Sequence, residues 1–419
     1  MLEISDRARD IVWKAERALT EQFSRIDAVE MVTQMRVLDA FREERVSARH
    51  FASTTGYGYD DIGRDTLDRV FARCMGAEAA LVRPQFVNGT HAIYTALAGV
   101  AEPGDVILGI SGKPYDTLEQ AIGLSGDAPN SLKKLGIDFQ FIELDEQGHI
   151  RMDAVMERLR KDRGIRIVYV QRSRGYAWRE AISVPEMGEA FAHIKAQYPE
   201  LLIMVDNCYG EFTQANEPTA VGADLIMGSL IKNPGGGLAP TGGYAAGKKS
   251  LIDRVAQRLT VPGMGAEVGS YSGDYRMFYQ GLFMAPHTTA QCVKCATLFA
   301  RVFEMLDLPV MPGSDAVRAD ITQVVELGSA EALVGFCGAI QKAAPVDSFV
   351  APEPWDMPGY ANQVVMAAGT FVQGATTELS ADGPVCAPYV AYLQGALSYA
   401  HARIAAMMAV DALLSGTNA

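Results

Sequence analysis

The stretch GSLIKNPGGGLAPTGGYAAG, residues 228–247, contains the features that decide how this chain folds. The apolar run DLIMGSL leads into Lys232, and Pro234 and three glycines follow almost at once. Short apolar runs bounded by turn residues are typical of buried β-strands. The later segment GGYAAG has the same character, with a turn on each side. The stretch therefore predicts two buried strands, with a lysine held at the end of the first.

Runs of this kind alternate with helix-like segments between residues 66 and 250. The candidate strands are, in chain order, AALVRP, DVILGIS, DFQFIEL, IRIVYVQ, LLIMVDN, DLIMGSL and GGYAAG. Helical segments such as NGTHAIYTALAGV and VPEMGEAFAHIKAQY lie between them. This alternation predicts an α/β fold with a mostly parallel seven-stranded sheet and helices on both faces.

The sequence on either side of this region has a different pattern. Residues 7–50 are rich in charge and helical in character, and a long helix is expected near 287–306. A last helix is expected from Tyr389 to Leu414. The expected parts are an N-terminal helical arm, a large domain and a small C-terminal α+β domain, over residues 1–55, 56–285 and 286–419.

The composition limits the classes of function. The chain has 419 residues, 49% of them hydrophobic and 21% charged, which is ordinary for a globular protein. A formal net charge of −13 argues against nucleic acid as a partner, because phosphate backbones require a basic face. No apolar run is long enough to span a bilayer, and the charged N-terminus does not resemble a signal peptide. Six scattered cysteines indicate reduced thiols, so we expect a cytoplasmic protein.

One glycine-rich segment imitates a nucleotide-binding loop. Gly242 to Lys248 matches the first part of the pattern GxxxxGK[ST], but Lys249 stands where Ser or Thr must hold magnesium. That pattern also needs a strand before its glycines, whereas here the glycine segment itself has strand character. We interpret it as a strand.

A second imitation is a CxxC pair. Cys292 and Cys295, with His287 upstream, have spacing that can bind zinc or cycle redox. They lie in TTAQCVKCATLFARVFEML, which is helical in pattern, and no second pair of ligands follows at finger spacing. We interpret both cysteines as structural residues one turn apart on a helix, and we expect no metal site.

Polar residues follow several of the predicted strands, and ligands of parallel α/β sheets bind at the carboxyl ends of strands. Asn88-Gly89-Thr90 opens an apolar helix, where free amides and a hydroxyl suit a phosphate, or where Asn or Thr serves as an ordinary N-cap. Asp206 ends an apolar strand, and a buried carboxylate there needs a partner. A protonated ring nitrogen would satisfy it, as would a salt bridge or a capping role.

Lys232 ends the next strand along the chain. A lysine shielded from water can have a depressed pKa and attack an aldehyde, whereas a surface lysine is the plain alternative. A phosphate cradle, a carboxylate for a pyridinium nitrogen and a lysine are together the parts of a pyridoxal 5′-phosphate (PLP) enzyme. The sequence therefore predicts PLP as the cofactor.

The chain resembles the fold-type-I PLP-dependent enzymes with their transferase-like fold, and within them the methionine γ-lyase-like or aluminium resistance group related to cystathionine β-lyases. The segments that carry the resemblance are RPQFVNGTHAIYTAL, GKPYDTLEQAIG, VYVQRSRGYAWR, VDNCYGEF, GSLIKNPGGGLAPTGGYAAG and ELSADGP with APYVAYLQGAL. They extend from roughly residue 15 to residue 410, and GSLIKNPGGG is the most specific of them.

This resemblance implies roles for the matching residues. Lys232 would form the Schiff base, and Asp206 would hold the pyridine nitrogen. Tyr115 would stack on the cofactor ring and shuttle protons, and Ser173 would lie near the 3′-oxygen. The residues implied at the phosphate are Asn88, Gly89, Thr90 and Ser229.

The resemblance also implies a partner subunit. Tyr57 and Tyr59 lie where related enzymes send a tyrosine across an interface to the neighbouring cofactor's phosphate. We therefore expect a homo-oligomer with a dimer as the catalytic unit, and a tetramer is usual in the family. The other expected partner is a small amino-acid substrate, with no nucleic acid and no membrane.

Two positions depart from the pattern that the resemblance implies. Ile231 stands where the wider family often has Thr, so one phosphate hydroxyl is missing. Cys386, in GPVCAPY, stands where an arginine is implied, and arginine is the natural bidentate partner of a substrate carboxylate. Arg174, Arg403 and Arg172 are the candidates to replace it, although Arg403 also fits a helix-surface charge.

These features predict a PLP-dependent lyase. It would cleave a C–S bond, at the β- or γ-carbon, of an amino acid such as methionine, cystathionine or cysteine, through aldimine and carbanion intermediates. Lys232 would remove the α-proton and Tyr115 would protonate the leaving group. Transamination, decarboxylation and β-replacement are alternatives, because the cofactor residues are shared. A non-catalytic metal-tolerance protein using His287, Cys292 and Cys295 is a third possibility.

Overall fold

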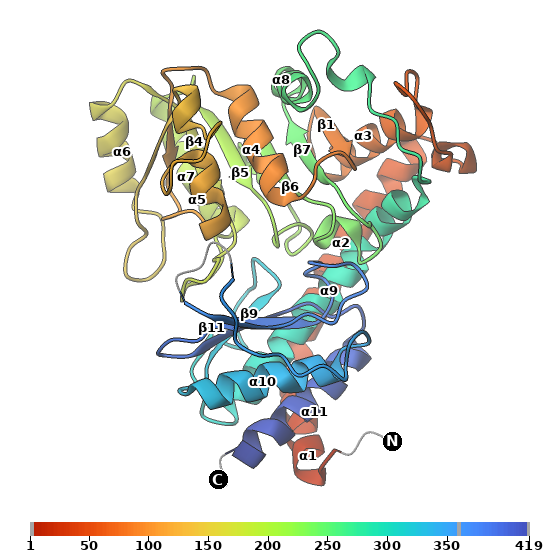
Figure 1. The fold of residues 1–419 in the computed structure, drawn as a ribbon, viewed down its shortest axis with the longest axis vertical. Helices are drawn as coiled ribbons and strands as arrows, with labels where there is room; N and C mark the ends of the chain where they lie inside the picture. The colour runs from red at the N-terminus through yellow and green to blue at the C-terminus, as the bar shows by residue number, and fades with distance from the viewer. Residues whose placement is uncertain (1–3, 358–361, 417–419) are drawn as a thin grey trace.

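The computed structural model describes residues 4–357 and 362–416, and the chain forms a larger and a smaller lobe joined by a long helix (Figure 1). The larger lobe contains a seven-stranded sheet in the order β1-β7-β6-β5-β4-β2-β3. Its strands are β1 (Ala79–Arg83), β2 (Val106–Gly109), β3 (Asp138–Phe141), β4 (Ile165–Gln171), β5 (Leu202–Asp206), β6 (Leu225–Ser229) and β7 (Gly243–Gly247). Strand β7 is antiparallel to both neighbours and the other pairs are parallel. The predicted α/β fold and its seven strands are confirmed.

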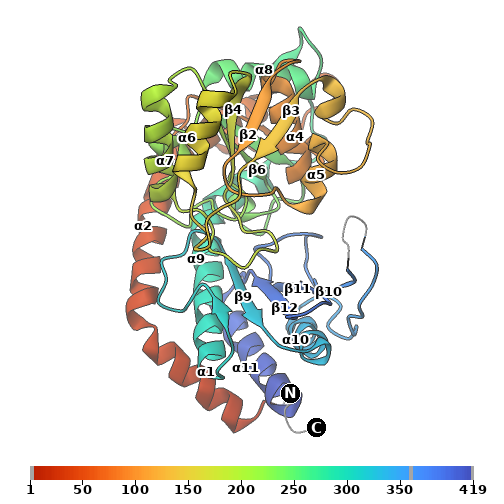
Figure 2. The same cartoon turned by 90° about the vertical axis from the view of Figure 1, so that its left-hand side faces the viewer.

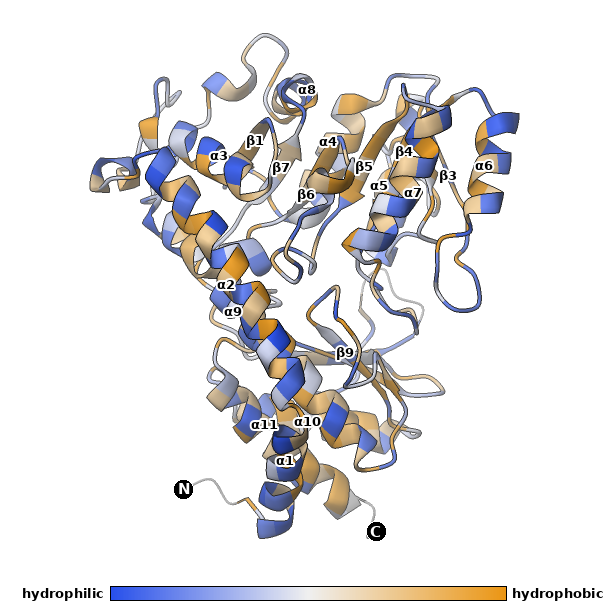
Figure 3. Cartoon of the chain, turned by 180° about the vertical axis from the view of Figure 1, so that it is seen from behind, coloured by the Kyte–Doolittle hydropathy of each residue, from blue (hydrophilic) through white to orange (hydrophobic). Residues whose placement is uncertain are grey.

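Helices cover both faces of this sheet, as predicted. Alternate residues of β5 contact the two layers: Ile203 and Val205 pack on one side and Met204 on the other. Figure 3 shows β5 as a hydrophobic strand, which fits burial on both faces. One side carries α3 (Ile62–Cys74), α6 (Met152–Lys161) and α7 (Val184–Gln197), and the other carries α4 (Gly89–Val100), α5 (Asp116–Ile122) and α8 (Lys249–Leu259).

The smaller lobe contains an antiparallel sheet in the order β10-β11-β12-β9-β8. Its strands are β8 (Val310–Met311), β9 (Thr322–Glu326), β10 (Val364–Ala367), β11 (Ser380–Pro384) and β12 (Val390–Gln394). Its apolar core is shared by residues of α9 (Arg276–Glu304), α10 (Ala330–Ala343), α11 (Tyr399–Gly416) and α1 (Asp6–Ala18). The expected small α+β unit is therefore present.

The N-terminal residues are helical, and α2 (Thr20–Glu43) packs along α9 (Figure 2). The expected division between residues 285 and 286 falls inside α9, so the domain boundaries stay a proposal. Short 3-10 turns complete the chain: η1 (Ala48–Phe51), η2 (Lys133–Leu135), η3 (Pro218–Val221), η4 (Asn233–Gly235) and η5 (Gly265–Glu267). Within the two described ranges, no helix is long and apolar enough to cross a membrane.

The prediction of one helix from Tyr389 to Leu414 is wrong. Residues 390–394 form β12, which pairs with β11 on one side and β9 on the other. Gly395 then turns the chain with a φ of +80°, where an added Cβ would lie 2.2 Å from the carbonyl oxygen of Glu378. Pairing within the sheet thus overrides the helical pattern, and the helix begins only at Tyr399.

The two imitations seen in the sequence have structural roles. The glycine segment that resembles a nucleotide-binding loop is the buried strand β7, as expected. Cys292 and Cys295 are both buried within α9, and His287 bonds to Glu30 at 2.8 Å. In the part of the chain that the structure describes, no three His, Cys, Asp or Glu side chains gather where they could hold a metal.

The turn after β6 packs directly against α9. Gly236 has a φ of +55°, and a Cβ there would lie 2.2 Å from the carbonyl oxygen of Gly281 in α9. A Cβ on Gly235 would lie 1.7 Å from the carbonyl oxygen of Leu230. The glycines after Lys232 are therefore required by close packing of the backbone.

Gly236→Ala is expected to lower the free energy of unfolding by about 2 kcal/mol or more, because the new Cβ meets the α9 backbone at a strained φ. Gly335→Ala in α10 is the matched control, since an added Cβ there has no atom within 4 Å. The control should leave stability unchanged or raise it by about 0.5–1 kcal/mol. Urea denaturation measures both, and equal stability of the two variants would contradict the packing account.

Candidate active site

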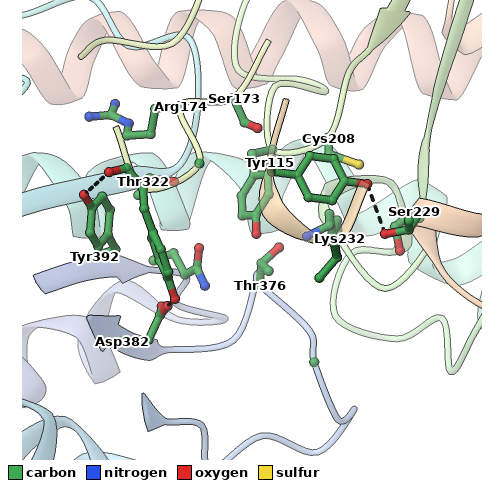
Figure 4. A pocket seen from close by; sticks show the side chains of 18 of the residues that line it. Tyr115, Ser173, Arg174, Cys208, Ser229, Lys232, Thr322, Thr376, Asp382 and Tyr392 are labelled. Atoms are coloured by element: carbon green, nitrogen blue, oxygen red, sulfur yellow. Dashed lines mark hydrogen bonds between the residues drawn. The ribbon is translucent and has the colours of Figure 1, made fainter. Parts of the chain in front are cut away.

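A cavity of about 630 Å³ lies where the carboxyl ends of the parallel strands face the small sheet (Figure 4). Its lining comes from the segments after β1, β2, β4, β5 and β6 and from strands of the small sheet. Most of the predicted site residues line it together: Asn88, Gly89, Thr90, Tyr115, Ser173, Arg174, Asp206, Ser229 and Lys232. Because the carboxyl ends of parallel strands meet at one edge, residues far apart in sequence converge here.

Lys232 lies between β6 and the turn η4, half-buried in the cavity wall. Its Nζ is 3.8 Å from the centroid of the Tyr209 ring. The next residue, Asn233, is fully buried and its amide donates to the carbonyl oxygens of Tyr209 and Glu211, each at 2.9 Å. These bonds fix the segment carrying Tyr209 to the segment carrying the lysine.

The environment of Lys232 differs from the expected one. Burial is the largest single influence and acts to lower the pKa of Lys232, but Tyr209, Cys208 and Asp206 together outweigh it and raise the pKa. The expected depressed pKa is therefore not found. The amine is stabilised as an ammonium by the aromatic ring beneath it and by the nearby carboxylate.

The N-terminus of α4 faces the same cavity. The Asn88 side chain accepts from the backbone N–H of His91 at 2.8 Å, so it is an ordinary N-cap, and its own oxygen is occupied. The buried Ser229 hydroxyl has no hydrogen-bond partner among the described residues. A Cβ on Gly89 would lie 3.1 Å from Ser229 Cβ, so the glycine allows the first helical turn to approach this hydroxyl.

Asp206 is buried at the end of β5 and lines the cavity. Its Oδ1 accepts from the backbone N–H of Cys208 at 3.1 Å. Burial raises the pKa of Asp206, although the bonds from Cys208 and the charge of Lys232 act in the opposite direction. A cationic hydrogen-bond donor in the cavity would stabilise this carboxylate.

Tyr115 precedes α5, and its hydroxyl donates to Thr90 Oγ1 at 3.0 Å. Its backbone N–H donates to Gln171 Oε1 at 2.9 Å, and Gln171 Nε2 donates to the carbonyl oxygen of Ser173 at 3.2 Å. Burial, with a smaller contribution from Asp206, raises the pKa of Tyr115 well above its ordinary value. The hydroxyl therefore keeps its proton at neutral pH and can donate it.

Of the three arginines considered for the substrate carboxylate, only Arg174 lies in the cavity lining. Arg174 lines the cavity, and its guanidinium is bonded to Asp320 at 3.3 Å and to the Met311 carbonyl oxygen at 3.0 Å. Arg172 is fully buried away from the cavity lining and bonds to Asn207 at 2.9 Å. The structure does not bring Arg403 to the cavity, because its guanidinium pairs with Glu16 of α1 at 3.2 Å.

Three further residues lie outside the cavity lining. Cys386 lies in the turn between β11 and β12. Tyr57 and Tyr59 are exposed, 65% and 60% respectively, and their rings stack on each other at 5.4 Å. Two exposed, stacked aromatic rings in a loop are available to a second subunit.

Sequence reasoning missed the small-sheet side of the cavity. Thr322, Asp382, Tyr392 and Gln394 line it, and Figure 4 shows Asp382 and Tyr392 across from Lys232. Tyr176 bridges the two sides: its hydroxyl donates to Asp382, and its carbonyl oxygen accepts from Tyr392 at 2.5 Å. A carboxylate among the small residues of ELSADGP was the available signal, since such a group inside a strand needs a partner.

Comparisons with the sequences of known proteins identify the family of this chain. The sequence matches the family model described as methionine gamma-lyase over residues 8–414. A Bacillus subtilis (strain 168) relative, named only as uncharacterized protein YnbB, is 48% identical over 390 residues, covering 93% of this chain and 92% of that protein.

Comparison with solved structures supports the same family and fold. The carbon-sulfur lyase involved in aluminum resistance from Clostridium novyi NT is 46% identical, with a TM-score of 0.94 over 97% of this chain and 96% of that chain. The pyridoxal-5′-phosphate dependent protein YhfS from Escherichia coli shares the fold, with a TM-score of 0.60 at 15% identity over 93% of this chain and 97% of that chain. The match of the family model to almost the whole chain, together with relatives identical at nearly half of the positions, confirms the resemblance: the chain belongs to the methionine gamma-lyase family.

Proposed function

We propose that this protein is a PLP-dependent lyase that cleaves the C–S bond of a sulfur-containing amino acid. One observation carries the proposal: an amine, a buried carboxylate and an unpaired buried hydroxyl, from Lys232, Asp206 and Ser229, line a single cavity. These are the groups that a pyridine aldehyde with a phosphate arm requires. Membership of the methionine gamma-lyase family supports the same chemistry.

The residues present fit PLP. The Ser229 hydroxyl and the first-turn amides of α4 would hold the phosphate, since both lie beside the close approach at Gly89. Asp206 would hold the ring nitrogen as a cation, which would give this carboxylate the partner that its burial demands. The amine of Lys232 would bond covalently to the aldehyde carbon of PLP. When bound, PLP supplies an electron sink for negative charge at the substrate Cα.

The chain's own residues would perform the proton transfers. Lys232, once released, would remove the proton from Cα, and Tyr115 would donate its hydroxyl proton to the departing sulfur. Thr90 accepts a hydrogen bond from Tyr115 and so orients that hydroxyl. Cleavage consumes one water in total and yields a thiol, a 2-oxoacid and ammonium.

The substrate carboxylate would bind Arg174. This is the arginine among the described residues that lines the cavity, and its three bonds to Asp320 and Met311 leave further N–H donors of the guanidinium. Asp320 holds the guanidinium in a fixed orientation, which suits bidentate recognition.

We further propose a homodimer as the smallest active unit. Exposed Tyr57 and Tyr59 would reach the phosphate in the neighbouring subunit, since within this chain neither lines the cavity. Sedimentation of the purified protein tests this, and a fully active monomer would rule it out.

The lyase reaction is tested by product analysis. The purified protein with added PLP should convert cystathionine, methionine or cysteine to thiol or sulfide, 2-oxoacid and ammonium in equal amounts. Lys232→Ala should lower kcat by about 10²–10⁴-fold, because the group that moves the Cα proton is lost. Lys113→Ala is the control: this lysine also lines the cavity but pairs with Glu119 at 2.7 Å, and its loss should change kcat only a few-fold. Oxoacid without thiol would indicate transamination and would contradict the proposal.

The phosphate site is tested by removing the unpaired hydroxyl. Ser229→Ala should weaken PLP binding by about 10- to 100-fold while leaving the stability of the cofactor-free protein unchanged or higher, since a buried unpaired group is removed. Thr289→Val is the matched control, because Thr289 is another buried hydroxyl without a partner among the described residues and lies outside the cavity lining. Fluorescence titration with PLP measures both affinities. Equal PLP affinity in Ser229→Ala and wild type would exclude this hydroxyl from the site.

A further inference from the structure

The small-sheet wall of the cavity carries a carboxylate that the proposed reaction does not use. Asp382 lies in β11, half-buried, and faces the cavity across from Lys232 (Figure 4). One of its oxygens accepts from the hydroxyl of Tyr176, which belongs to the loop between β4 and α7. Its other oxygen has no hydrogen-bond donor among the described residues, and it is not sealed from the cavity.

The cations of the cavity are engaged elsewhere. Arg174 pairs with Asp320 at 3.3 Å, and Lys113 pairs with Glu119 at 2.7 Å. No Lys or Arg nitrogen in the described residues lies within ion-pair distance of Asp382. Lys232 lowers the pKa of Asp382 from a distance, but in the proposed function its amine is engaged by the cofactor.

The charge of Asp382 is left without a cationic partner, unlike that of Asp206. Asp206 receives the ring nitrogen of the cofactor in the proposed function, whereas Asp382 receives a neutral hydroxyl only. Burial raises the pKa of Asp382 to about 6, so the carboxyl is ionised at pH 8. A carboxylate facing a partly buried cavity without a cation is costly unless a ligand supplies one.

We propose that Asp382 binds a positively charged nitrogen on the sulfur-linked part of the substrate, and that the protein acts on thioether amino acids whose leaving thiol carries an ammonium group. This inference rests on the proposed function. It favours cystathionine, whose departing thiol bears an amine, over methionine and cysteine, which carry no second nitrogen. Tyr176 and Tyr392 are positioning residues: the ring of Tyr392 packs 4.7 Å from that of Tyr176, whose hydroxyl orients the carboxylate.

Two probe substrates of equal chain length separate the charge from the shape of the ligand. S-(2-aminoethyl)cysteine ends in an ammonium where S-propylcysteine ends in a methyl group. At pH 8 the wild-type kcat/KM should be about 10- to 100-fold higher for the aminoethyl compound, the range expected for a hydrogen bond to a charged group. Asp382→Asn should bring this ratio close to one while retaining cleavage of S-propylcysteine, which also shows that the variant is folded.

Asp116→Asn is the matched control. Asp116 is another carboxylate that lines the cavity, at the start of α5, and its removal should leave the preference in place. Equal loss of preference in the two variants would assign it to the overall negative potential of the cavity and would overturn a specific role for Asp382. An unchanged ratio in Asp382→Asn would overturn it as well.

A binding measurement separates this inference from the lyase proposal. Calorimetry with the Lys232→Ala variant, which cannot turn the probes over, should give a lower Kd for the aminoethyl than for the propyl compound. The difference should vanish in the Lys232→Ala, Asp382→Asn double variant. If neither probe is cleaved by wild type but the Asp382-dependent difference in Kd persists, the lyase proposal fails and the cation site stands. Equal Kd values for the two probes would contradict the cation site directly.

Discussion

The backbone of Gly235 and Gly236 passes so close to the end of β6 and to α9 that no Cβ fits between them. This contact holds the turn that begins at Lys232, and it makes α9 the support of the candidate site as well as the link between the lobes. Asn233 extends the constraint to the segment after β5 through its two bonds to backbone carbonyls. The position of the lysine amine over the Tyr209 ring thus follows from backbone packing, and a flexible lysine on a glycine-rich loop is the opposite of what the structure shows.

The second constraint is the pairing of charged side chains in the partly buried cavity. Two of the cations that line the cavity are already paired within the chain, Arg174 with Asp320 and Lys113 with Glu119. Burial raises the pKa of Asp206 and of Asp382, which line the cavity from opposite lobes. Each would be stabilised by a cation that the chain does not supply. We assign one to the cofactor ring and the other to the substrate, which divides the cavity into a part for chemistry and a part for specificity.

The seven strands of the large sheet were predictable because their apolar runs are continuous and bounded by turns, and Lys232 and Asp206 followed because strand ends converge in such a fold. The small-sheet wall was not predictable from local pattern. Residues 390–394 have a helical pattern, yet pairing with β9 and β11 makes them a strand that carries Tyr392 into the cavity. The position of Arg403 away from the cavity depends on its ion pair with Glu16, and the raised pKa of Lys232 depends on Tyr209. Neither contact can be inferred from the spacing of residues in the sequence.

The central claim is that Lys232 is the residue that binds the cofactor covalently. Borohydride reduction of the PLP-loaded protein, followed by proteolysis and mass spectrometry, locates the modified lysine. The account predicts a single modified peptide, the one that contains Lys232. Modification of Lys113, the other lysine that lines the cavity, or of no lysine at all, would contradict it.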